Sequence, residues 1–470
     1  MCNLSGRYIH KMVRVVFSVI AIFAFTYCDG QVRYDPTWES LDKRPLPQWF
    51  DEAKFGIFLH WGVYSVPSFG SEWFWSNWKS GNKDIVSFMK KNYPPNFTYQ
   101  DFAKDFSAQL FDPNAWAKLF VRAGAKYVVL TSKHHEGYTL WPSKYSFSWN
   151  VRDVGPNRNL LGELAAAVRT TNVRFGVYHS LYEWYNPLYL SDKGSNFTKN
   201  NFVSQKVIPE MMELVQDYTP DVIWSDGDWE ANDTYWKSTE FLAWLYNESP
   251  VKDTVVVNDR WGKGIPCRHG DFYNCKDRYD PGVLQKHKWE NAMTVDKGSW
   301  GYRRNVNYDS FYTVKELIQV LAETVSCGGN LLVNVGPTSD GRIDPIFEDR
   351  LINLGRWLSI NGRAIYATKP WQYQKDSLAP VWYTSSKSVI YAIVLDWPPS
   401  NTLSLASSIS AFKINATKVS LLGNPENLHW EFVNNTVSIK FPDKATVKCD
   451  WSWTLQIQND STNEVNDNYY

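Results

Sequence analysis

The chain has 470 residues, and its 49 lysines and arginines equal its 49 aspartates and glutamates, so the formal net charge is zero. This balance excludes the basic field that nucleic-acid binding requires, and no run of like charge indicates an interaction tail. Hydrophobic residues make up 44% and charged residues 21%, which is typical of a globular protein with one large and one smaller domain. The aromatic content of 16% is unusual and fits either a large core or a surface that stacks on sugar rings.

Residues 1–30 have the pattern of a secretory signal peptide. A basic stretch at 7–14 precedes an apolar run at 15–27, which is too short to cross a bilayer as a helix. We expect cleavage within residues 28–31, and Met12 is an alternative to Met1 as the initiator. This pattern predicts the secretory pathway, ending in the lysosome or outside the cell, and no later segment is apolar enough to span a membrane.

Sequons and cysteines indicate the same route. Cys267 and Cys275 bracket a short loop and are predicted to form a disulfide in an oxidising compartment. Cys327 lies in an apolar run and is predicted to be a buried free thiol, whereas Cys449 has no evident partner. Seven Asn-x-Ser/Thr sequons follow the signal segment, at Asn96, Asn196, Asn232, Asn247, Asn415, Asn434 and Asn459.

Short apolar segments alternate with amphipathic helical stretches through most of the chain. Continuous apolar strands of this kind predict parallel β structure covered on both faces. The predicted strands lie at 54–62, 127–135, 174–180, 221–227, 254–260, 289–295 and 329–337, and the clearest helices at 111–126, 159–173, 203–218 and 314–325. This alternation predicts a (β/α)₈-like barrel over residues 31–366 rather than an open sheet.

Polar residues end several of these predicted strands. Barrel enzymes build their active sites at the carboxyl ends of the strands, so this placement predicts a catalytic face. The residues concerned are His60, His134, His135, His179, Asp226 and Arg260.

The pattern changes after residue 366. Short strands separated by turn residues, with no helical stretch between them, predict a β-sandwich over residues 367–460. It has few histidines or clustered carboxylates, so we expect a packing or accessory role. Residues 461–470 are polar and predicted to be disordered.

Seven motifs, in order along the chain, resemble those of the α-L-fucosidases of glycoside hydrolase family 29. They are FLHWG (58–62), EW (72–73), TSKHHEG (131–137), WSDG (224–227), NDRW (258–261), KWE (288–290) and GNLLVNVGP (329–337). The match covers residues 34–366, and the predicted sandwich corresponds to the family's C-terminal domain. The resemblance implies hydrolysis of terminal α-L-fucose from fucosylated glycans with retention, through a covalent fucosyl-enzyme. It also implies a homo-oligomer.

The resemblance places the nucleophile at Asp226. A carboxylate that ends an apolar strand, flanked by Trp224 and Trp229, would be held rigidly in a partly desolvated pocket. The alternative is an aspartate that merely caps the following helix. The surrounding motifs favour the nucleophile.

Two residues compete for the role of acid/base. Retaining hydrolysis needs a second carboxyl group about 5–5.5 Å from the nucleophile, acting first as acid and then as base. Asp277 follows the Arg260 strand on the predicted catalytic face, next to the predicted disulfide loop. Glu290 belongs to a motif by which the family is often recognised, but it starts a strand and so falls at the opposite face of a barrel. We prefer Asp277 and keep Glu290 as the alternative.

The resemblance also implies a set of sugar-binding residues. Imidazoles and a carboxylate can hydrogen-bond to vicinal hydroxyls, and an aromatic wall suits the methyl group of a deoxy sugar. Tyr178 and His179 stand at the same strand end, so the choice of Tyr178 is open, and Trp300 is a candidate for a further wall. The implied set is His60, Glu72, Trp73, His134, His135, Tyr178, Trp224 and Arg260.

The run His134-His135-Glu136 raises the question of a metal. Adjacent strand residues point to opposite faces, and the chain has no His-x-x-x-His spacing, so we predict neither a metal site nor a cofactor.

Two other functions are compatible with these motifs. One is a fucose-binding protein on the same fold that has lost catalysis, and the other is a glycosidase for a different sugar. Asp226 is intact, which argues against the first, and the set of histidines and glutamate argues against the second, although spacing alone does not exclude it.

Overall fold

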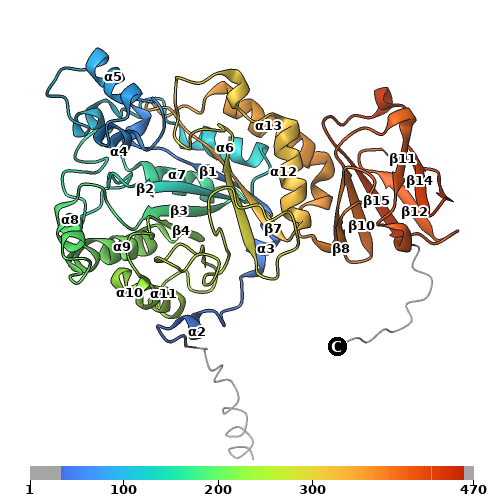
Figure 1. Cartoon of the computed structure of the whole chain (residues 1–470), viewed down its shortest axis with the longest axis horizontal. Coiled ribbons are helices and arrows are strands. Elements are labelled where there is room, and N and C mark those ends of the chain that lie inside the picture. Colours follow the sequence, from blue (N-terminus) through green and yellow to red (C-terminus); the bar gives the residue numbers. More distant parts are fainter. Residues whose placement is uncertain (1–32, 425, 460–470) are drawn as a thin grey trace, which may run out of the picture.

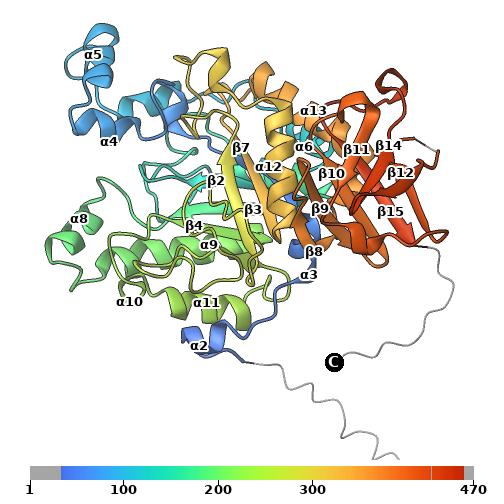
Figure 2. The same ribbon diagram turned by 45° about the vertical axis from the view of Figure 1, so that its right-hand side comes forward.

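The computed structural model describes residues 33–424 and 426–459. The predicted signal peptide and the predicted tail therefore lie outside the described residues. Within them, a domain built on a parallel sheet lies beside two antiparallel sheets (Figures 1 and 2).

Seven parallel strands form the first sheet in the order β5-β4-β3-β2-β1-β7-β6. They are β1 (Phe55–Leu59), β2 (Tyr127–Lys133), β3 (Arg174–Ser180), β4 (Val222–Asp226), β5 (Val256–Val257), β6 (Trp289–Thr294) and β7 (Gly329–Val335). The accompanying helices are α2 (Trp38–Leu41), α3 (Gln48–Ala53), α4 (Phe74–Lys79), α5 (Lys83–Asn92), α6 (Pro113–Arg122), α7 (Leu160–Arg169), α8 (Pro187–Gly194), α9 (Ile208–Tyr218), α10 (Asp233–Trp236), α11 (Ser238–Asn247), α12 (Val314–Ser326) and α13 (Pro345–Asn361).

The sequence patterns account for these elements. Nearly every residue of the strands is buried, as continuous apolar runs between covering helices predict. Asp112 caps α6 through its side chain, and Pro113 occupies the first turn, where its missing N–H costs nothing. A reciprocal capping box between Thr313 and Glu316 starts α12. One short π-helical turn precedes α9, within the range predicted as one helix.

A loop segment closes this sheet into a barrel. The edge strands β5 and β6 do not pair with each other, and residues 271–273 lie between them. The Phe272 N–H donates to the Val257 carbonyl at 3.3 Å on one side, and the Tyr273 N–H donates to the Lys288 carbonyl at 2.9 Å on the other. The predicted (β/α)₈-like barrel is therefore confirmed, in an irregular form with an eighth position that is a loop rather than a strand.

Aromatic rings fill the barrel interior. Side chains at alternate strand positions point inward, and glycines make room for the largest of them. A Cβ atom at Gly56 would lie 2.5 Å from the Tyr127 ring, so only glycine fits opposite that ring. The interior rings include Phe58, Tyr127, Tyr178, Trp224 and Phe272.

The C-terminal region contains the predicted antiparallel strands in two sheets. The five-stranded sheet has the order β12-β15-β10-β9-β8, and the three-stranded sheet has the order β11-β14-β13. Helices α12 and α13 lie between the barrel strands and these sheets in both views, and the Trp357 indole of α13 donates to the Ser452 carbonyl at 3.0 Å. The strands are β8 (Lys369–Lys375), β9 (Val381–Ser386), β10 (Val389–Val394), β11 (Thr402–Leu405), β12 (Thr417–Leu421), β13 (Trp430–Val433), β14 (Thr436–Lys440) and β15 (Trp453–Asn459).

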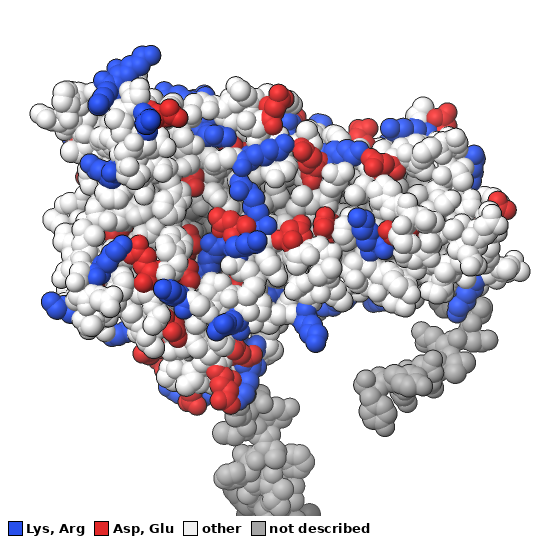
Figure 3. All heavy atoms as spheres, viewed as in Figure 1, with Lys and Arg blue, Asp and Glu red and all other residues white. Residues whose placement is uncertain are grey.

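The surface carries charges of both signs. Basic and acidic side chains are interspersed over the face shown in Figure 3, as a net charge of zero predicts. Among the residues described, no helix combines the length and apolar character needed to span a membrane.

Candidate active site

A pocket opens at the carboxyl ends of the barrel strands. It encloses about 410 Å³ of empty space, including open solvent at its mouth. All the residues predicted to bind sugar line it, together with Asp226, Asp277 and Trp300. The full lining is Phe58, His60, Glu72, Trp73, His134, His135, Tyr178, Trp224, Asp226, Trp229, Arg260, Asp277 and Trp300.

Asp226 ends β4 and is held by two donors. The Tyr178 hydroxyl donates to its Oδ2 at 2.7 Å, and Nη1 of Arg260 donates to its Oδ1 at 3.1 Å. His135 Nε2 lies 3.6 Å from Oδ2. The carboxylate is buried and its two oxygens have separate partners, so its orientation is fixed.

Arg260 connects Asp226 to Asp277. Its second terminal nitrogen, Nη2, donates to Asp277 Oδ1 at 2.7 Å, while the guanidinium lies 4.7 Å from the centre of the Trp224 ring. Burial alone would lower the pKa of Arg260, but the charges of Asp277 and Asp226 raise it above its ordinary value, so the group stays cationic. The Asp277 side chain is 50% exposed, unlike that of Asp226.

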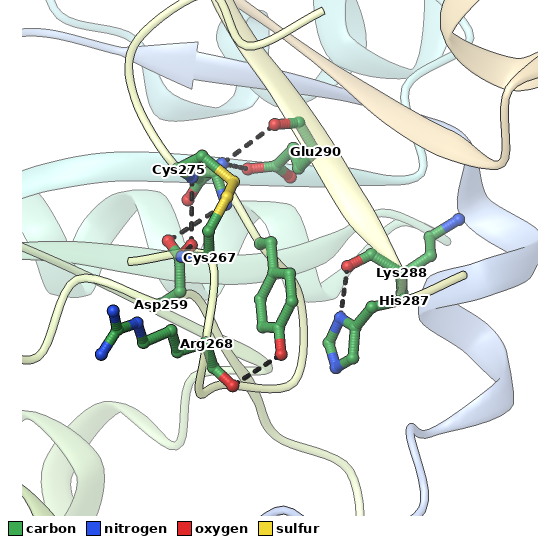
Figure 4. Close-up of a disulfide and its surroundings, with 9 residues drawn as sticks. Asp259, Cys267, Arg268, Cys275, His287, Lys288 and Glu290 are labelled. Carbon is green, nitrogen blue, oxygen red and sulfur yellow. Dashed lines mark hydrogen bonds between the residues drawn. A yellow bond between two sulfur atoms is a disulfide. The ribbon is translucent and has the colours of Figure 1, made fainter. Parts of the chain in front are cut away.

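The loop that carries Asp277 is held in place by the Asp259 carboxylate and a disulfide. The buried Asp259 carboxylate accepts backbone N–H groups from Cys267 at 2.7 Å, Asn274 at 3.0 Å and Cys275 at 3.0 Å. The structure contains a disulfide between Cys267 and Cys275 next to this carboxylate (Figure 4). The disulfide and the carboxylate together fix the segment that leads to Asp277.

Glu290 lies in the barrel interior and does not line the pocket. Its carboxylate accepts hydrogen bonds from the Tyr127 hydroxyl at 2.5 Å, the Trp224 indole at 3.0 Å and the Asn274 side chain at 3.3 Å. Burial raises the pKa of Glu290 to about 7, against the opposing effect of these donors. Its partners place it beneath Trp224, which forms the floor of the pocket, and the Asn274 side chain joins it to the loop that carries Asp277.

His60 is held as a neutral imidazole in one tautomer. The Asn334 side-chain nitrogen donates to Thr294 Oγ1 and to the Trp300 carbonyl, so its oxygen must accept from His60 Nδ1, at 2.8 Å. Burial and the neighbouring His134 hold the pKa of His60 well below its usual value. The hydrogen-bond network therefore assigns Nε2 of His60 as an acceptor.

The same logic applies to His135. The Ser180 hydroxyl donates to the Tyr182 carbonyl at 2.7 Å, which leaves its oxygen to accept from His135 Nδ1 at 2.7 Å. Burial, with His134 nearby, lowers the pKa of His135 well below its usual value. Nε2 of His135 is thus a second acceptor.

Glu72 uses one oxygen for the fold. Oε2 accepts from the Trp300 N–H at 2.9 Å, the Gly301 N–H at 3.1 Å and the Ser299 hydroxyl at 3.2 Å. No described residue donates to Oε1, so this oxygen is available to a ligand.

The structure separates Tyr178 from His179. Tyr178 faces the pocket, whereas His179 contacts Glu210 at 3.1 Å in a buried ion network that includes Lys133. The register of β3 therefore assigns these two side chains to opposite faces of the strand.

His134 and His135 do not point to opposite faces, contrary to the prediction from strand alternation. Strand β2 ends at Lys133, so the alternation of a strand no longer applies, and both imidazoles line the pocket with ring centroids 4.1 Å apart. Among the described residues, the His, Cys, Asp and Glu atoms close enough to share an ion belong to Asp259, Cys267 and Cys275, whose sulfurs are bonded to each other.

Two lining residues were absent from the predicted set. Phe58 is on β1, two positions before His60, which directly follows the strand, so the two-residue period of a strand could reveal it. The sequence marks Trp229 only as a flank of Asp226. It sits in the loop after β4, where no periodic signal exists.

Paired carboxylates and aromatic rings at the strand ends of a barrel define a glycoside hydrolase. Comparison with known proteins identifies its family. The family described as Alpha-L-fucosidase matches residues 22–363, and the one described as Alpha-L-fucosidase C-terminal domain matches residues 374–458. The chain belongs to the α-L-fucosidase family, whose characteristic mechanism retains the anomeric configuration.

Individual relatives agree with this assignment. An α-L-fucosidase of Branchiostoma floridae is 56% identical over 435 residues, which cover 91% of this chain and 96% of that protein. The human plasma α-L-fucosidase is 54% identical, with coverage of 91% and 93%. The crystal structure of the Thermotoga maritima α-fucosidase with a mechanism-based inhibitor superposes with a TM-score of 0.79 at 34% identity, covering 91% of this chain and 100% of that one.

The raised pKa of Glu290 predicts how the stability of the protein depends on pH. Between its ordinary value of 4.5 and about 7, the folded protein binds a proton here that the unfolded chain has released, so this group's contribution to stability falls as the pH rises. Glu290→Gln removes that dependence. We expect the free energy of unfolding of Glu290→Gln, relative to wild type, to rise by about 3 kcal/mol across this window.

Urea unfolding at several pH values between 4.5 and 7.5 measures this difference. The exposed Glu240→Gln variant serves as the control and should show no such trend. If the difference in free energy of unfolding between Glu290→Gln and wild type stays constant with pH, the raised pKa of Glu290 is contradicted.

Proposed function

We propose that the protein hydrolyses terminal α-L-fucose from fucosylated glycans with retention, using Asp226 as nucleophile and Asp277 as acid/base. The observation that carries the proposal is the Arg260 guanidinium, whose two terminal nitrogens bind one oxygen of each carboxylate, at 3.1 Å and 2.7 Å. One planar cation between two carboxylates supports the short separation that retaining hydrolysis needs.

The two carboxylates are suited to different steps. Asp226 is buried and oriented by Tyr178 and Arg260, which favours attack by a fixed oxygen on the anomeric carbon. Asp277 is half-exposed, so it can give a proton to the departing glycosidic oxygen and later take one from the entering water. Hydrolysis of the fucosyl ester on Asp226 then releases fucose with its original configuration.

The rest of the pocket supports selection of fucose. The Nε2 atoms of His60 and His135 and Oε1 of Glu72 would accept from sugar hydroxyls, and a sugar lacking the matching hydroxyl would leave them unpaired. The Phe58, Trp224 and Trp300 rings provide an apolar surface for the methyl group. No cofactor is needed for these steps.

Glu290 is less suited to acid/base catalysis. Three donors already occupy its carboxylate in the barrel interior, and it does not border the pocket. We assign it instead to support of the Trp224 floor and of the loop that carries Asp277. The site gives no support to an inactive fucose-binding protein, because both proposed carboxylates are present.

Replacing Asp226 tests the function itself. We expect wild type to hydrolyse an aryl α-L-fucoside, and Asp226→Ala to lower kcat by about four orders of magnitude while retaining fucose binding, because the covalent route is lost. Steady-state kinetics and calorimetric titration with fucose provide the two readouts, and the exposed Asp253→Ala variant is the control. Fucose binding without turnover by wild type would indicate a lectin-like protein, and turnover of another glycoside alone would indicate a different sugar.

Azide rescue tests the choice of acid/base. A small anion can enter the space left in Asp277→Ala and attack the fucosyl-enzyme, giving a fucosyl azide of retained configuration with recovery of rate. We expect rescue in Asp277→Ala and none in Glu290→Ala. The latter variant should also lose activity, because Trp224 at the floor of the pocket loses its hydrogen bond to Glu290. Rescue confined to Glu290→Ala would overturn the assignment.

For localisation, we propose passage through the secretory pathway to the lysosome or the exterior, with glycans on five of the seven sequons. Two asparagines serve the fold instead: Asn247 exchanges hydrogen bonds with the Tyr34 backbone at 2.9 and 2.8 Å, and Asn459 donates to the Ala411 carbonyl at 3.3 Å. The exposed asparagines are Asn96, Asn196, Asn232, Asn415 and Asn434.

The homo-oligomer implied by the family resemblance stays a prediction.

Glycopeptide mass spectrometry of the protein secreted by animal cells measures occupancy at each sequon. We expect high occupancy at the five exposed asparagines and low occupancy at Asn247 and Asn459, because a glycan would compete with their hydrogen bonds. Full occupancy at Asn247, or no glycan at any sequon, would contradict the proposal.

A further inference from the structure

Two residues differ from the rest of the pocket lining in their exposure. Trp229 is 41% exposed and the Asp277 side chain is 50% exposed, whereas the other lining residues are buried or partly buried. Buried residues form the floor and walls of a pocket, and exposed ones form its mouth. Trp229 and Asp277 therefore mark the opening through which a leaving group must extend.

The position of Asp277 indicates where the leaving group lies in this opening. If Asp277 protonates the glycosidic oxygen, the group attached to that oxygen lies beside Asp277 and outside the fucose pocket. This step rests on the proposed function. The exposed aromatic ring at the same mouth is then a surface that the next sugar can contact.

Trp229 is built as a fixed surface rather than a loose side chain. Its ring stacks at 26° with Trp73, with centroids 6.2 Å apart, and receives edge contacts from Tyr182 at 5.4 Å and His135 at 5.6 Å. These contacts hold the indole while part of it stays open to solvent. Within the described part of the chain, the Trp229 indole N–H donates to no other residue, so it too is available to a ligand.

We propose that Trp229 is a specificity-determining residue that binds the sugar to which fucose is attached. The ligand class is a pyranose that presents a face of C–H groups, with hydroxyls at its rim. Such a ring can lie on the exposed part of the indole and accept the indole N–H at one oxygen. Because this contact involves only the leaving group, it influences glycan hydrolysis without contributing to recognition of fucose.

Two substrates with different leaving groups test the proposal. One is a disaccharide of α-L-fucose linked to galactose, and the other is α-L-fucosyl fluoride, whose leaving group is too small to reach Trp229. We expect Trp229→Ala to lower kcat/KM for the disaccharide at least about tenfold more than it lowers kcat/KM for the fluoride. Trp229→Phe keeps an aromatic ring, so it should retain more activity on the disaccharide than Trp229→Ala does.

A matched control and the remaining outcomes complete the test. Tyr373 in β8 is also 41% exposed but lies in the C-terminal sheets, so Tyr373→Ala should change neither substrate. Equal losses on both substrates in Trp229→Ala would make Trp229 part of the fucose pocket, and no loss on either would remove it from recognition. Both results overturn the proposal. Failure of wild type to hydrolyse either substrate would instead refute the proposed function, and this inference with it.

Discussion

The site depends on one interaction, the Arg260 guanidinium held between Asp226 and Asp277. Two carboxylates close together repel each other, and a planar cation with two separate donors can hold both in a fixed orientation. The backbone supports this arrangement, because the Ser225 hydroxyl next to Asp226 donates to the Arg260 carbonyl at 2.6 Å. This hydrogen bond therefore ties the end of β4 to the residues after β5.

The irregular closure of the barrel also helps to position the two carboxylates, Asp226 and Asp277. Strand β5 has only two residues, and the chain beyond it forms a long loop instead of a helix and a further strand. That loop closes the barrel at residues 271–273 and then delivers Asp277 to the mouth of the pocket. Asp259, the disulfide and Glu290 all hold it in place, so closure of the fold and placement of the second carboxylate are two results of one set of contacts.

Much of this arrangement is readable from the sequence because parallel strands have a strong signature. Apolar runs that end in His60 or Asp226 predict both a strand and the face on which its last side chain lies. The limits appear where periodicity stops. Residues 271–273 pair with β5 and β6 without forming a strand of their own. His134 and His135 follow the end of β2, and the choice between Tyr178 and His179 depends on a one-residue register. None of these has a compositional signal.

The high aromatic content, for which composition favours a large core over a sugar-binding surface, serves both purposes at different depths. Tyr127 and Phe272 fill the barrel interior, and Trp224 stands above them as the floor of the pocket, its indole N–H bound to Glu290. Trp229 reaches the solvent at the mouth. The polar acceptors proposed to select fucose are tied into the buried layers, so changing them disturbs the fold. A residue at the mouth has no such ties on its exposed part. Preference for the attached sugar can therefore vary by substitution at the mouth while the fucose pocket beneath it stays unchanged.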